Sequence, residues 1–326
     1  MRKKQQPTGP FRAGDVVQLT GPKGRLNTIT LVEGAAFGTH RGDLKHDAII
    51  GQPEGSIVKN QNGVEYLALR PLMTDFVLSM PRGAAIIYPK DSAQILVQGD
   101  IFPGANVVEA GVGSGALSMY LLRVLGEHGT LNSFERRAEF AEIAQANVAA
   151  QYGEEPKNWN VHLGDLQIEL PKKCAPGTVD RVVLDMLAPW ECVDAVSEAL
   201  IPGGLVIGYI ATVTQMSRFV EALRASKQYA EPEAFESMVR DWHLQGLAVR
   251  PEHRMIGHTG FLVTARRLAP GAELPQFKKV KGDFSDEDLS VWNPEHLGER
   301  QVGEKKLRKS LRNAKAGAEA RAALED

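Results

Sequence analysis

The chain has 326 residues, 43% hydrophobic and 24% charged, a composition typical of globular proteins and a length that suits about two domains. Its 38 basic and 40 acidic residues give a formal net charge of −2, a sum that by itself argues against a polyanionic partner. No apolar run approaches the roughly 18 residues of a membrane helix, and no apolar signal core follows the charged N-terminus. The two cysteines, Cys174 and Cys192, lack the spacing of a disulfide scaffold or a zinc site, so we expect a cytoplasmic protein without metal.

Short β segments separated by turns fill the region from about residue 11 to 75. The apolar and β-branched runs predict strands at 16–20, 27–32, 47–51, 55–58 and 65–69. The glycine and proline at 21–24 predict a turn between the first two strands. No helical period is visible before about residue 91. We therefore predict a small all-β domain over residues 1–75.

From about residue 76 to 270, apolar strands alternate with amphipathic helices. This alternation predicts βαβ units and a doubly wound parallel sheet. The predicted strands are 106–110, 130–135, 159–163, 180–185, 204–209 and 260–267, and the predicted helices are 117–125, 138–151 and 193–200.

The tail over residues 271–326 has a different composition. Residues 282–299 hold six acidic residues and no Lys or Arg, whereas 300–321 hold eight Lys or Arg against two Glu. Neither part has regular apolar spacing, so we predict a disordered or partner-ordered extension, in which 300–321 can form a solvated helix. The first 12 residues add four basic groups and no acid. The near-neutral total therefore hides basic segments and does not exclude RNA.

Three alternating glycines, Gly111, Gly113 and Gly115, stand between a strand and a helix. Glycines let the backbone turn tightly and approach a ligand, and the helix start offers free N–H donors. The loop also fits the dinucleotide pattern, with Ala116 in the last position. Glu109 favours S-adenosylmethionine, because a carboxylate suits a ligand with an ammonium and a sulfonium group better than a pyrophosphate. The alternative is a glycine-rich turn without a ligand.

Two further acids follow the next strands. Glu135 ends a predicted strand, where its carboxylate can accept hydrogen bonds from both ribose hydroxyls of either cofactor class. Asp165, after Gly164 and before Leu166, can receive the adenine amino group of the cofactor. An Asp in this position is equally well explained as a helix N-cap.

Asp185 directly follows the apolar run 181–184, and ligands bind at the carboxyl ends of strands in open α/β sheets. The stretch from Asp185 to Pro189 and Trp190 suits a flat amino-bearing ring, with the carboxylate on the amino group and apolar walls against the faces. The alternative is a capping Asp and a core Trp. Tyr88 begins the segment 88–94, which precedes the glycine loop by one short helix. It can stack on an extruded base, or it can be a tyrosine buried at a domain junction.

These segments together resemble one family, the tRNA (adenine-N1)-methyltransferases that modify the T-loop adenosine at tRNA position 58. The resemblance covers roughly residues 11–269, and its motifs are residues 46–51, 88–91, 100–105, 109–117, 185–190 and 211–215. It implies a Rossmann-like S-adenosylmethionine-dependent methyltransferase sheet with a small N-terminal all-β domain. It also implies a catalytic subunit that acts on tRNA, not DNA, and a homotetramer of the prokaryotic type.

The resemblance also implies the roles of individual residues. It makes Asp185 the residue that orients the adenine. From their own chemistry and position we predict Tyr88, Pro189 and Trp190 at the substrate, with Asp185 and Tyr88 as the catalytic residues. Phe140 stands where the family often has a histidine. The predicted cofactor contacts are Gln94, Glu109, Gly111, Gly113, Ser114, Gly115, Ala116, Leu117, Glu135, Asp165, Leu166 and Asp185.

Basic side chains that are candidates for tRNA contact fall in three segments: Arg2, Lys3, Lys4 and Arg12; Arg41, Lys45 and His46; and Arg250, His253, Arg254 and His258. The alternative function is another methyltransferase on the same fold that acts on a small molecule such as a precorrin. A nicotinamide dehydrogenase and a non-catalytic tRNA-binding subunit are weaker alternatives. The glycine loop and the strand-end Asp argue against the non-catalytic subunit.

Overall fold

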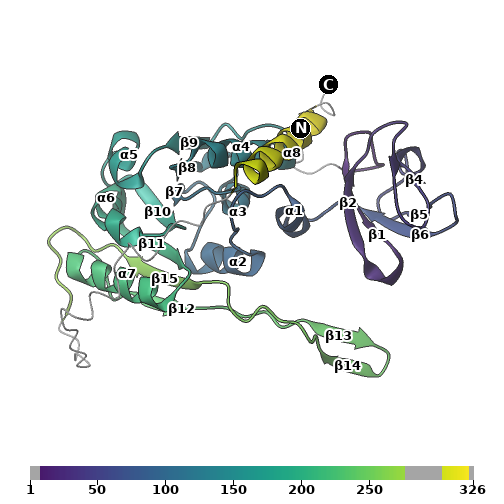
Figure 1. The fold of residues 1–326 in the computed structure, drawn as a ribbon. Coiled ribbons are helices and arrows are strands. Elements are labelled where there is room, and N and C mark those ends of the chain that lie inside the picture. The colour runs from purple at the N-terminus through teal and green to yellow at the C-terminus, as the bar shows by residue number, and fades with distance from the viewer. Residues whose placement is uncertain (1–7, 276–302, 323–326) are drawn as a thin grey trace. The chain divides into compact units, whose positions relative to one another are not determined.

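A computed structural model describes residues 8–275 and 303–322 (Figure 1). The chain forms two compact units. The first comprises Met1–Gly83, Glu142–Pro156 and Glu304–Asp326, and the second comprises Ala84–Ala141 and Lys157–Gly303. We call them the N-terminal unit and the sheet unit. Helix α4 (Ala138–Tyr152) begins in the sheet unit and continues in the N-terminal unit.

The N-terminal unit contains a small antiparallel β domain. Four strands form a sheet in the order β2-β1-β6-β5, and β3 and β4 form a separate pair. Alternate residues point inward, as Val17 and Leu19 do on one strand and Tyr66 and Ala68 on another, and they form a core with Phe11 and Leu31. The strands are β1 (Val16–Thr20), β2 (Leu26–Thr30), β3 (Ala36–Phe37), β4 (Leu44–Lys45), β5 (Ile57–Lys59) and β6 (Glu65–Leu69).

Two predictions for this region were wrong. The predicted strand 47–51 is replaced by a 3-10 turn, η2 (His46–Ala48), because the His46 carbonyl accepts hydrogen bonds from the backbone of Ile49 and Ile50. The turn places Ile49 in the core, so the apolar run marks buried residues and not a strand. A helix also precedes residue 91: α1 (Met73–Ser79) has seven residues, too few to show a period in the sequence. The predicted turn at 21–24 contains η1 (Pro22–Gly24).

Helix α8 (Glu304–Ala322) belongs to the same unit and occupies much of the charged tail. Its Ser310 hydroxyl donates to the Arg82 carbonyl at 2.8 Å, and Ala314 is 1% exposed. The helix lies along α4, where Lys315 pairs with Glu142 (Figure 1). These residues are therefore helical and packed, and the expected disorder does not apply to them. The acidic stretch 282–299 lies outside the described residues.

The sheet unit is built on seven strands in the order β12-β15-β11-β10-β7-β8-β9. Strands β7 to β11 are parallel neighbours, and β15 runs antiparallel between β11 and β12. The prediction of an α/β sheet with a small β domain is confirmed, with one antiparallel strand inserted. The strands are β7 (Asn106–Ala110), β8 (Thr130–Glu135), β9 (Trp159–Leu163), β10 (Val179–Leu184), β11 (Leu200–Ile210), β12 (Glu233–Phe235) and β15 (Phe261–Arg266).

Helices cover the sheet in two groups. Buried side chains of α5, α6 and α7 share one apolar cluster with strand residues such as Val108, Val182 and Leu184. The intervening residues Val107 and Glu109 point to the opposite face, where Glu109 meets a side chain of α3. The helices and turns are α2 (Pro89–Gln98), α3 (Ala116–Leu125), η3 (Gly126–His128), α5 (Leu166–Lys173), η4 (Pro189–Cys192), α6 (Val193–Ala199) and α7 (Val213–Ser226).

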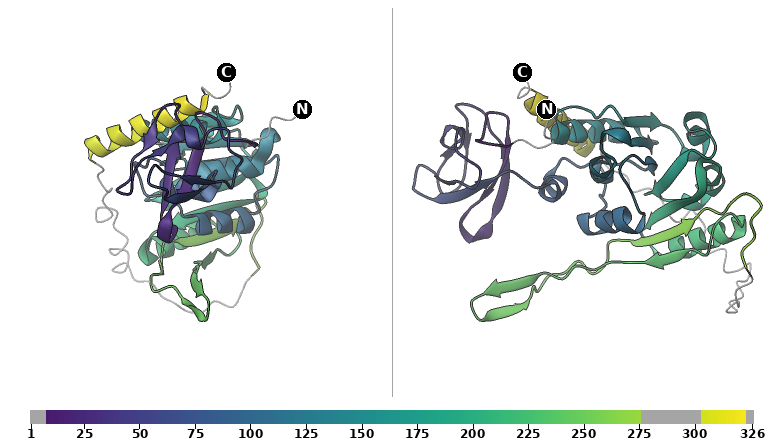
Figure 2. Two further views of the ribbon diagram at one scale, coloured as in Figure 1. Left: turned by 90° about the vertical axis from the view of Figure 1, so that its right-hand side faces the viewer. Right: turned by 180° about the vertical axis from the view of Figure 1, so that it is seen from behind.

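A two-stranded hairpin, β13 (Trp242–Gln245) and β14 (Ala248–Pro251), extends from the sheet unit beyond its seven-stranded sheet (Figures 1 and 2). The hairpin was not predicted, although apolar Trp242 and Leu244 alternate with polar His243 and Gln245 in β13. No helix within the described ranges 8–275 and 303–322 is long and apolar enough to cross a membrane.

Candidate active site

The carboxyl ends of the parallel strands meet at one edge of the sheet, and the strand order reverses between β7 and β10. Ligands bind at such a switch point in open α/β sheets. The loop after β7 and the residue after β10 touch here: Asp185 donates its backbone N–H to the Ala110 carbonyl. A side chain at Gly111 would stand 2.5 Å from the Asp185 carbonyl oxygen, so this position requires glycine.

The rest of the glycine loop turns into α3. Gly113 and Gly115 have φ angles of +58° and +80°, values that disfavour other residues, and Gly115 is the N-cap of the helix. Ser114, Ala116 and Leu117 follow the same turn and are buried. The loop therefore presents backbone, not side chains, to the edge of the sheet.

Glu135, at the end of β8, holds this loop. One carboxylate oxygen accepts the Gly113 N–H at 3.1 Å, and the other accepts the Arg137 N–H at 3.1 Å. Glu135 is only 5% exposed. The Arg137 guanidinium stacks on the ring of Phe140, 3.8 Å from its centroid, so Phe140 supports an arginine next to this acid.

Glu109 is buried on β7 beneath the loop. Its Oε2 accepts hydrogen bonds from the hydroxyls of Ser118 and Ser133, each at 2.7 Å. Its Oε1 is also buried and has no hydrogen-bond partner among the described residues. Burial raises the pKa of Glu109 to about 7, against the lowering effect of the two hydroxyls. The unpartnered oxygen is a place where a cationic ligand group can bind.

Asp185 is half-buried at the end of β10. Burial, and then the negative charge of Glu135, raises the pKa of Asp185 to about 7. The charge of Asp185 in turn helps to raise the pKa of Glu109. The three carboxyl groups therefore interact, and a bound cation would favour the ionised form of each.

Asp165 and Leu166 lie at the start of α5. Asp165 is its N-cap residue but makes no capping side-chain hydrogen bond, and it pairs instead with the Arg136 guanidinium at 2.8 Å. Leu166 is 2% exposed and packs in the apolar cluster, so only its backbone faces the sheet edge. Gln94 is half-buried on α2.

A buried ion pair fixes the start of α2, where Tyr88 is the N-cap. The Lys90 ammonium donates to Asp91 at 2.6 Å and to the Thr259 hydroxyl at 2.7 Å. The Thr259 hydroxyl also donates to Asp91 at 2.6 Å. Asp91 is 1% exposed, and the network joins α2 to the segment before β15.

Tyr209, at the carboxyl end of β11, is the residue that sequence reasoning missed. Its ring would be 2.6 Å from a side chain at Gly260. Burial, followed by the charges of Asp91 and Asp185, raises the pKa of Tyr209, and Tyr88 makes a smaller electrostatic contribution. Its place at the end of the predicted strand 204–209 was the available signal, since parallel strands end at one edge.

Pro189 and Trp190 do not form an open wall. Both are buried in η4, and Trp190 belongs to the apolar cluster with the Arg218 guanidinium 4.1 Å from its ring centroid. Their burial corrects the prediction of a substrate clamp and favours the core interpretation. Gln215, the last residue of the motif 211–215, donates from its side-chain amide to the Leu187 carbonyl at 2.9 Å and holds this loop.

The basic residues predicted to contact tRNA differ in their exposure. His46 is buried and its Nδ1 accepts the Val32 N–H at 3.0 Å, so its prediction as a tRNA contact was wrong. His258 pairs with Glu236 at 2.9 Å, which raises its pKa. Several of the others are exposed: Arg12, Lys45, Arg250, His253 and Arg254. Arg2, Lys3 and Lys4 lie outside the described residues.

Comparison with known proteins identifies the family of the chain. Residues 9–58 match the family described as TrmI-like N-terminal, and residues 66–249 match the tRNA methyltransferase complex GCD14 subunit. The tRNA (adenine(58)-N(1))-methyltransferase TrmI of Thermus thermophilus is 34% identical over 245 residues, 75% of this chain and 94% of that protein. The chain belongs to this methyltransferase family.

Further relatives and solved structures are also methyltransferases. The tRNA (adenine(57)-N(1)/adenine(58)-N(1))-methyltransferase TrmI of Methanocaldococcus jannaschii is 31% identical, over 71% of this chain and 87% of that one. The structure of the tRNA (m1A58) methyltransferase TrmI from Aquifex aeolicus covers 80% of this chain and 99% of its own, with a TM-score of 0.71 and 27% identity. A Thermotoga maritima structure described as a SAM-dependent O-methyltransferase covers 81% and 96%, with a TM-score of 0.75 and 27% identity. The predicted family, enzyme class and cofactor are confirmed.

Proposed function

We propose that this chain methylates N1 of adenosine 58 in the T-loop of tRNA, with S-adenosylmethionine as the methyl donor. Membership of the TrmI family supports the activity. Within the structure, the assignment depends on one observation: Asp185 stands at the switch point, in backbone contact with the glycine loop. An acceptor held by this carboxylate lies beside a cofactor held by the loop.

The residues at the sheet edge fit S-adenosylmethionine. The buried, unpartnered Oε1 of Glu109 suits its ammonium or sulfonium charge, and the turn from Gly113 to Leu117 offers backbone N–H groups. Glu135 keeps lone pairs for the ribose hydroxyls, and Asp165 suits the adenine amino group. When bound there, S-adenosylmethionine supplies the methyl group.

Asp185 is proposed to orient the target base. N1 of adenine has a free lone pair and carries no proton, so the site needs no strong general base and works mainly by positioning. The Asp185 carboxylate accepts a hydrogen bond from the N6 amino group, and its charge stabilises the cationic ring as 1-methyladenine forms. Only the ionised carboxyl group supplies that charge.

The acceptor edge of the base is hidden in folded tRNA, so the adenosine has to be extruded from the loop. Tyr88 is half-buried at the start of α2. Tyr88 and Asp185 are both close enough to Tyr209 to affect its pKa. We propose that Tyr88 contacts the extruded base. Tyr209, a neutral phenol whose pKa is raised further by burial, is proposed to supply a hydrogen-bond donor nearby.

Methylation of an unmodified tRNA transcript with labelled S-adenosylmethionine, followed by mapping of the product nucleoside, tests the proposed activity. We expect 1-methyladenosine at position 58 and no transfer to a matched transcript with guanosine at that position. Equal labelling of both transcripts, or methyl transfer only to small-molecule acceptors, would contradict the proposal.

We further propose that the chain works as a homotetramer in which the β13–β14 hairpin takes part in self-association. Support comes from its apolar exposure: Leu244 and Leu247 are 72% and 104% exposed, and Trp242 is 55% exposed. A two-stranded hairpin is marginally stable alone, and apolar residues gathered on it mark an interaction site.

The mass of the particle in solution, measured by light scattering, tests this second proposal. The double variant Leu244→Ser/Leu247→Ser is expected to give a smaller particle than the wild type. Ile168→Ser, a change at an exposed apolar residue of α5, serves as the control and leaves the mass unchanged. A wild-type monomer, or a double variant with the wild-type mass, would refute the role of the hairpin.

A further inference from the structure

We infer that helix α8 is a tRNA-backbone-binding element, a role that rests on the proposed tRNA substrate. The helix carries seven Lys or Arg against two Glu. It lies beyond residue 249, where the matched family region ends. Its charge is therefore a feature of this chain that the family assignment does not explain.

The first step of the argument is that α8 is anchored through one face. Ser310 donates to the Arg82 carbonyl, Ala314 is 1% exposed, and a side chain at Gly317 would be 3.4 Å from the Ala150 methyl group. With 3.6 residues per turn, positions 310, 314 and 317 lie on the same side of a helix. These small residues let α8 pack closely against α4 and leave its other face to solvent.

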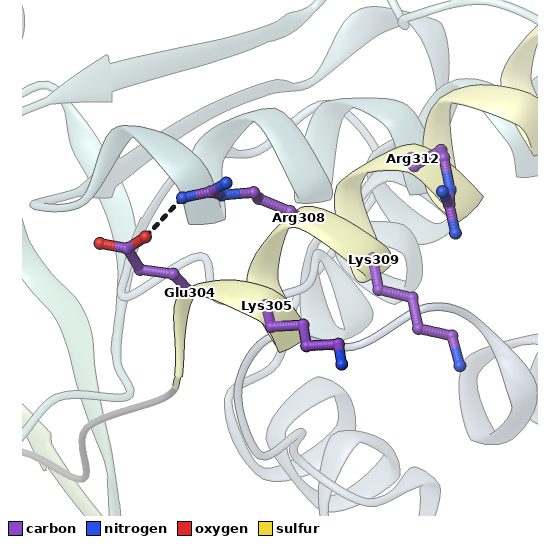
Figure 3. A pocket seen from close by; sticks show the side chains of 5 residues that line it. All are labelled: Glu304, Lys305, Arg308, Lys309 and Arg312. Carbon is purple, nitrogen blue, oxygen red and sulfur yellow. Dashed lines mark hydrogen bonds and ion pairs between the residues drawn. The ribbon is translucent and has the colours of Figure 1, made fainter.

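The second step is that the outward face is basic and unneutralised. Lys305, Lys309 and Arg312 fall on the side opposite the anchor and line a hollow along α8, with their charged ends on the same side of the helix (Figure 3). Within residues 8–275 and 303–322 none of the three has a carboxylate within ion-pair distance. Arg308, by contrast, turns toward Glu304 and pairs with it.

The third step concerns the kind of partner. At a rise of 1.5 Å per residue, positions 305 and 312 are about 10 Å apart along the axis, a length comparable with a few phosphates of one nucleic-acid strand. Glu304 also lines this hollow but pairs with Arg308, so the three other cations remain available to match the repeating charge of a sugar-phosphate backbone. The face has no aromatic side chain for base stacking, so we infer binding through the backbone alone.

A triple charge variant of the full chain, Lys305→Gln/Lys309→Gln/Arg312→Gln, tests the inference. We expect its affinity for unmodified tRNA to fall about ten-fold or more near 0.1 M salt, and the slope of log K against log salt to become shallower by about 2 to 3. The turnover number at saturating tRNA and the affinity for S-adenosylmethionine should stay at the wild-type values.

A matched variant, Lys157→Gln/Lys172→Gln/Lys173→Gln, removes the same charge from exposed positions of the sheet unit. Equal losses of tRNA affinity in both variants would show that only the net charge matters and would overturn the inference. Wild-type affinity and salt slope in the α8 triple variant would overturn it as well. Failure of the proposed function is seen separately, because the wild-type chain would then not methylate tRNA.

Discussion

At the residue scale, three carboxyl groups lie close enough to influence one another: Glu109 and Asp185 have raised pKa values, and Glu135 contributes its charge to both. Burial is the largest cause for each raised group. A cation bound among them would lower both pKa values by attraction. Ligand binding and proton release are therefore coupled at this edge of the sheet.

Replacement of Asp185 by Ala should reduce turnover by about 10²–10³, the usual cost of losing one group that stabilises developing charge. The affinity for S-adenosylmethionine should change much less, because Glu109 and the glycine loop remain. Single-turnover methylation and calorimetric titration measure the two quantities. Asp194→Ala, at an exposed position of α6, is the control. Methyl transfer at the wild-type rate by the Asp185 variant would refute its role.

The same residue predicts a pH dependence. Only the ionised carboxyl of Asp185 accepts the hydrogen bond from N6 and provides the negative charge. With its pKa near 7 in the free protein, kcat/KM should rise with pH through about 7 and level off above it. In Asp185→Asn, which has no ionisable group at this position, the low residual kcat/KM should not rise with pH through 7. A wild-type profile that is flat between pH 6 and 8 would contradict the prediction.

Glu109 is predicted to act on cofactor binding and not on the base. In Glu109→Gln the side-chain oxygen can still accept hydrogen bonds from Ser118 and Ser133, but the negative charge is lost. We expect the Kd for S-adenosylmethionine to rise about ten-fold or more, since charge-assisted hydrogen bonds contribute roughly 1.5–3 kcal/mol. Turnover at saturating cofactor should be retained. An unchanged Kd would show that Glu109 has a purely structural role.

At the element scale, the start of α2 depends on a buried ion pair. Lys90 and Asp91 are adjacent, 14% and 1% exposed at their side chains, and both bond to Thr259, which lies 168 residues from Asp91 along the chain. The network therefore fixes the backbone that presents Tyr88. Removal of one partner leaves the other charge buried without compensation.

Asp91→Ala is accordingly expected to lower the free energy of unfolding by about 3 kcal/mol or more. Glu65→Ala, which removes the exposed pair with Lys59, should cost less than about 1 kcal/mol. Denaturant titration measures both. If Asp91 positions Tyr88, the variant should also lose turnover under conditions where it stays folded. Equal stability losses for the two variants would contradict the role of burial.

Much of the sheet could be predicted from the sequence, because each parallel strand is a short apolar run between helices or turns. The strand at 106–110, the glycine loop and the acids Glu135 and Asp185 follow from local pattern alone. The position of Asp185 against Gly111 was also foreseeable, since parallel strands end at one edge. The antiparallel insertion of β15 was not, because strand direction depends on chain connections that carry no local signal.

The remaining differences have physical reasons. Trp190 was predicted as a wall for the base, but the sequence around it does not distinguish a ring on the surface from one packed below α7. His46 has a basic side chain, yet its ring nitrogen completes a backbone hydrogen bond of Val32. In both residues the outcome depends on tertiary contacts. Helix α1 was missed because seven residues are too few to establish a period.

At the scale of the whole molecule, cofactor binding should stabilise the fold, because only the folded chain assembles the glycine loop with the three carboxyl groups. At 100 times the Kd, S-adenosylmethionine is expected to add about 2.7 kcal/mol to the free energy of unfolding. A thermal melt with S-adenosylmethionine, and a parallel melt with NAD, provides the measurement. A shift with NAD alone would contradict the assignment of the cofactor.

The anchoring of α8 also has a consequence for biosynthesis. Ser310 and its partner Arg82 are 228 residues apart, so the ribosome makes the surface of α4 and the Arg82 segment long before the helix that covers it. That surface stays open to solvent while the strands that follow α4, from β9 to β15, are being translated. The sheet unit can fold as its strands emerge, whereas closure of the N-terminal unit has to wait for the translation of α8.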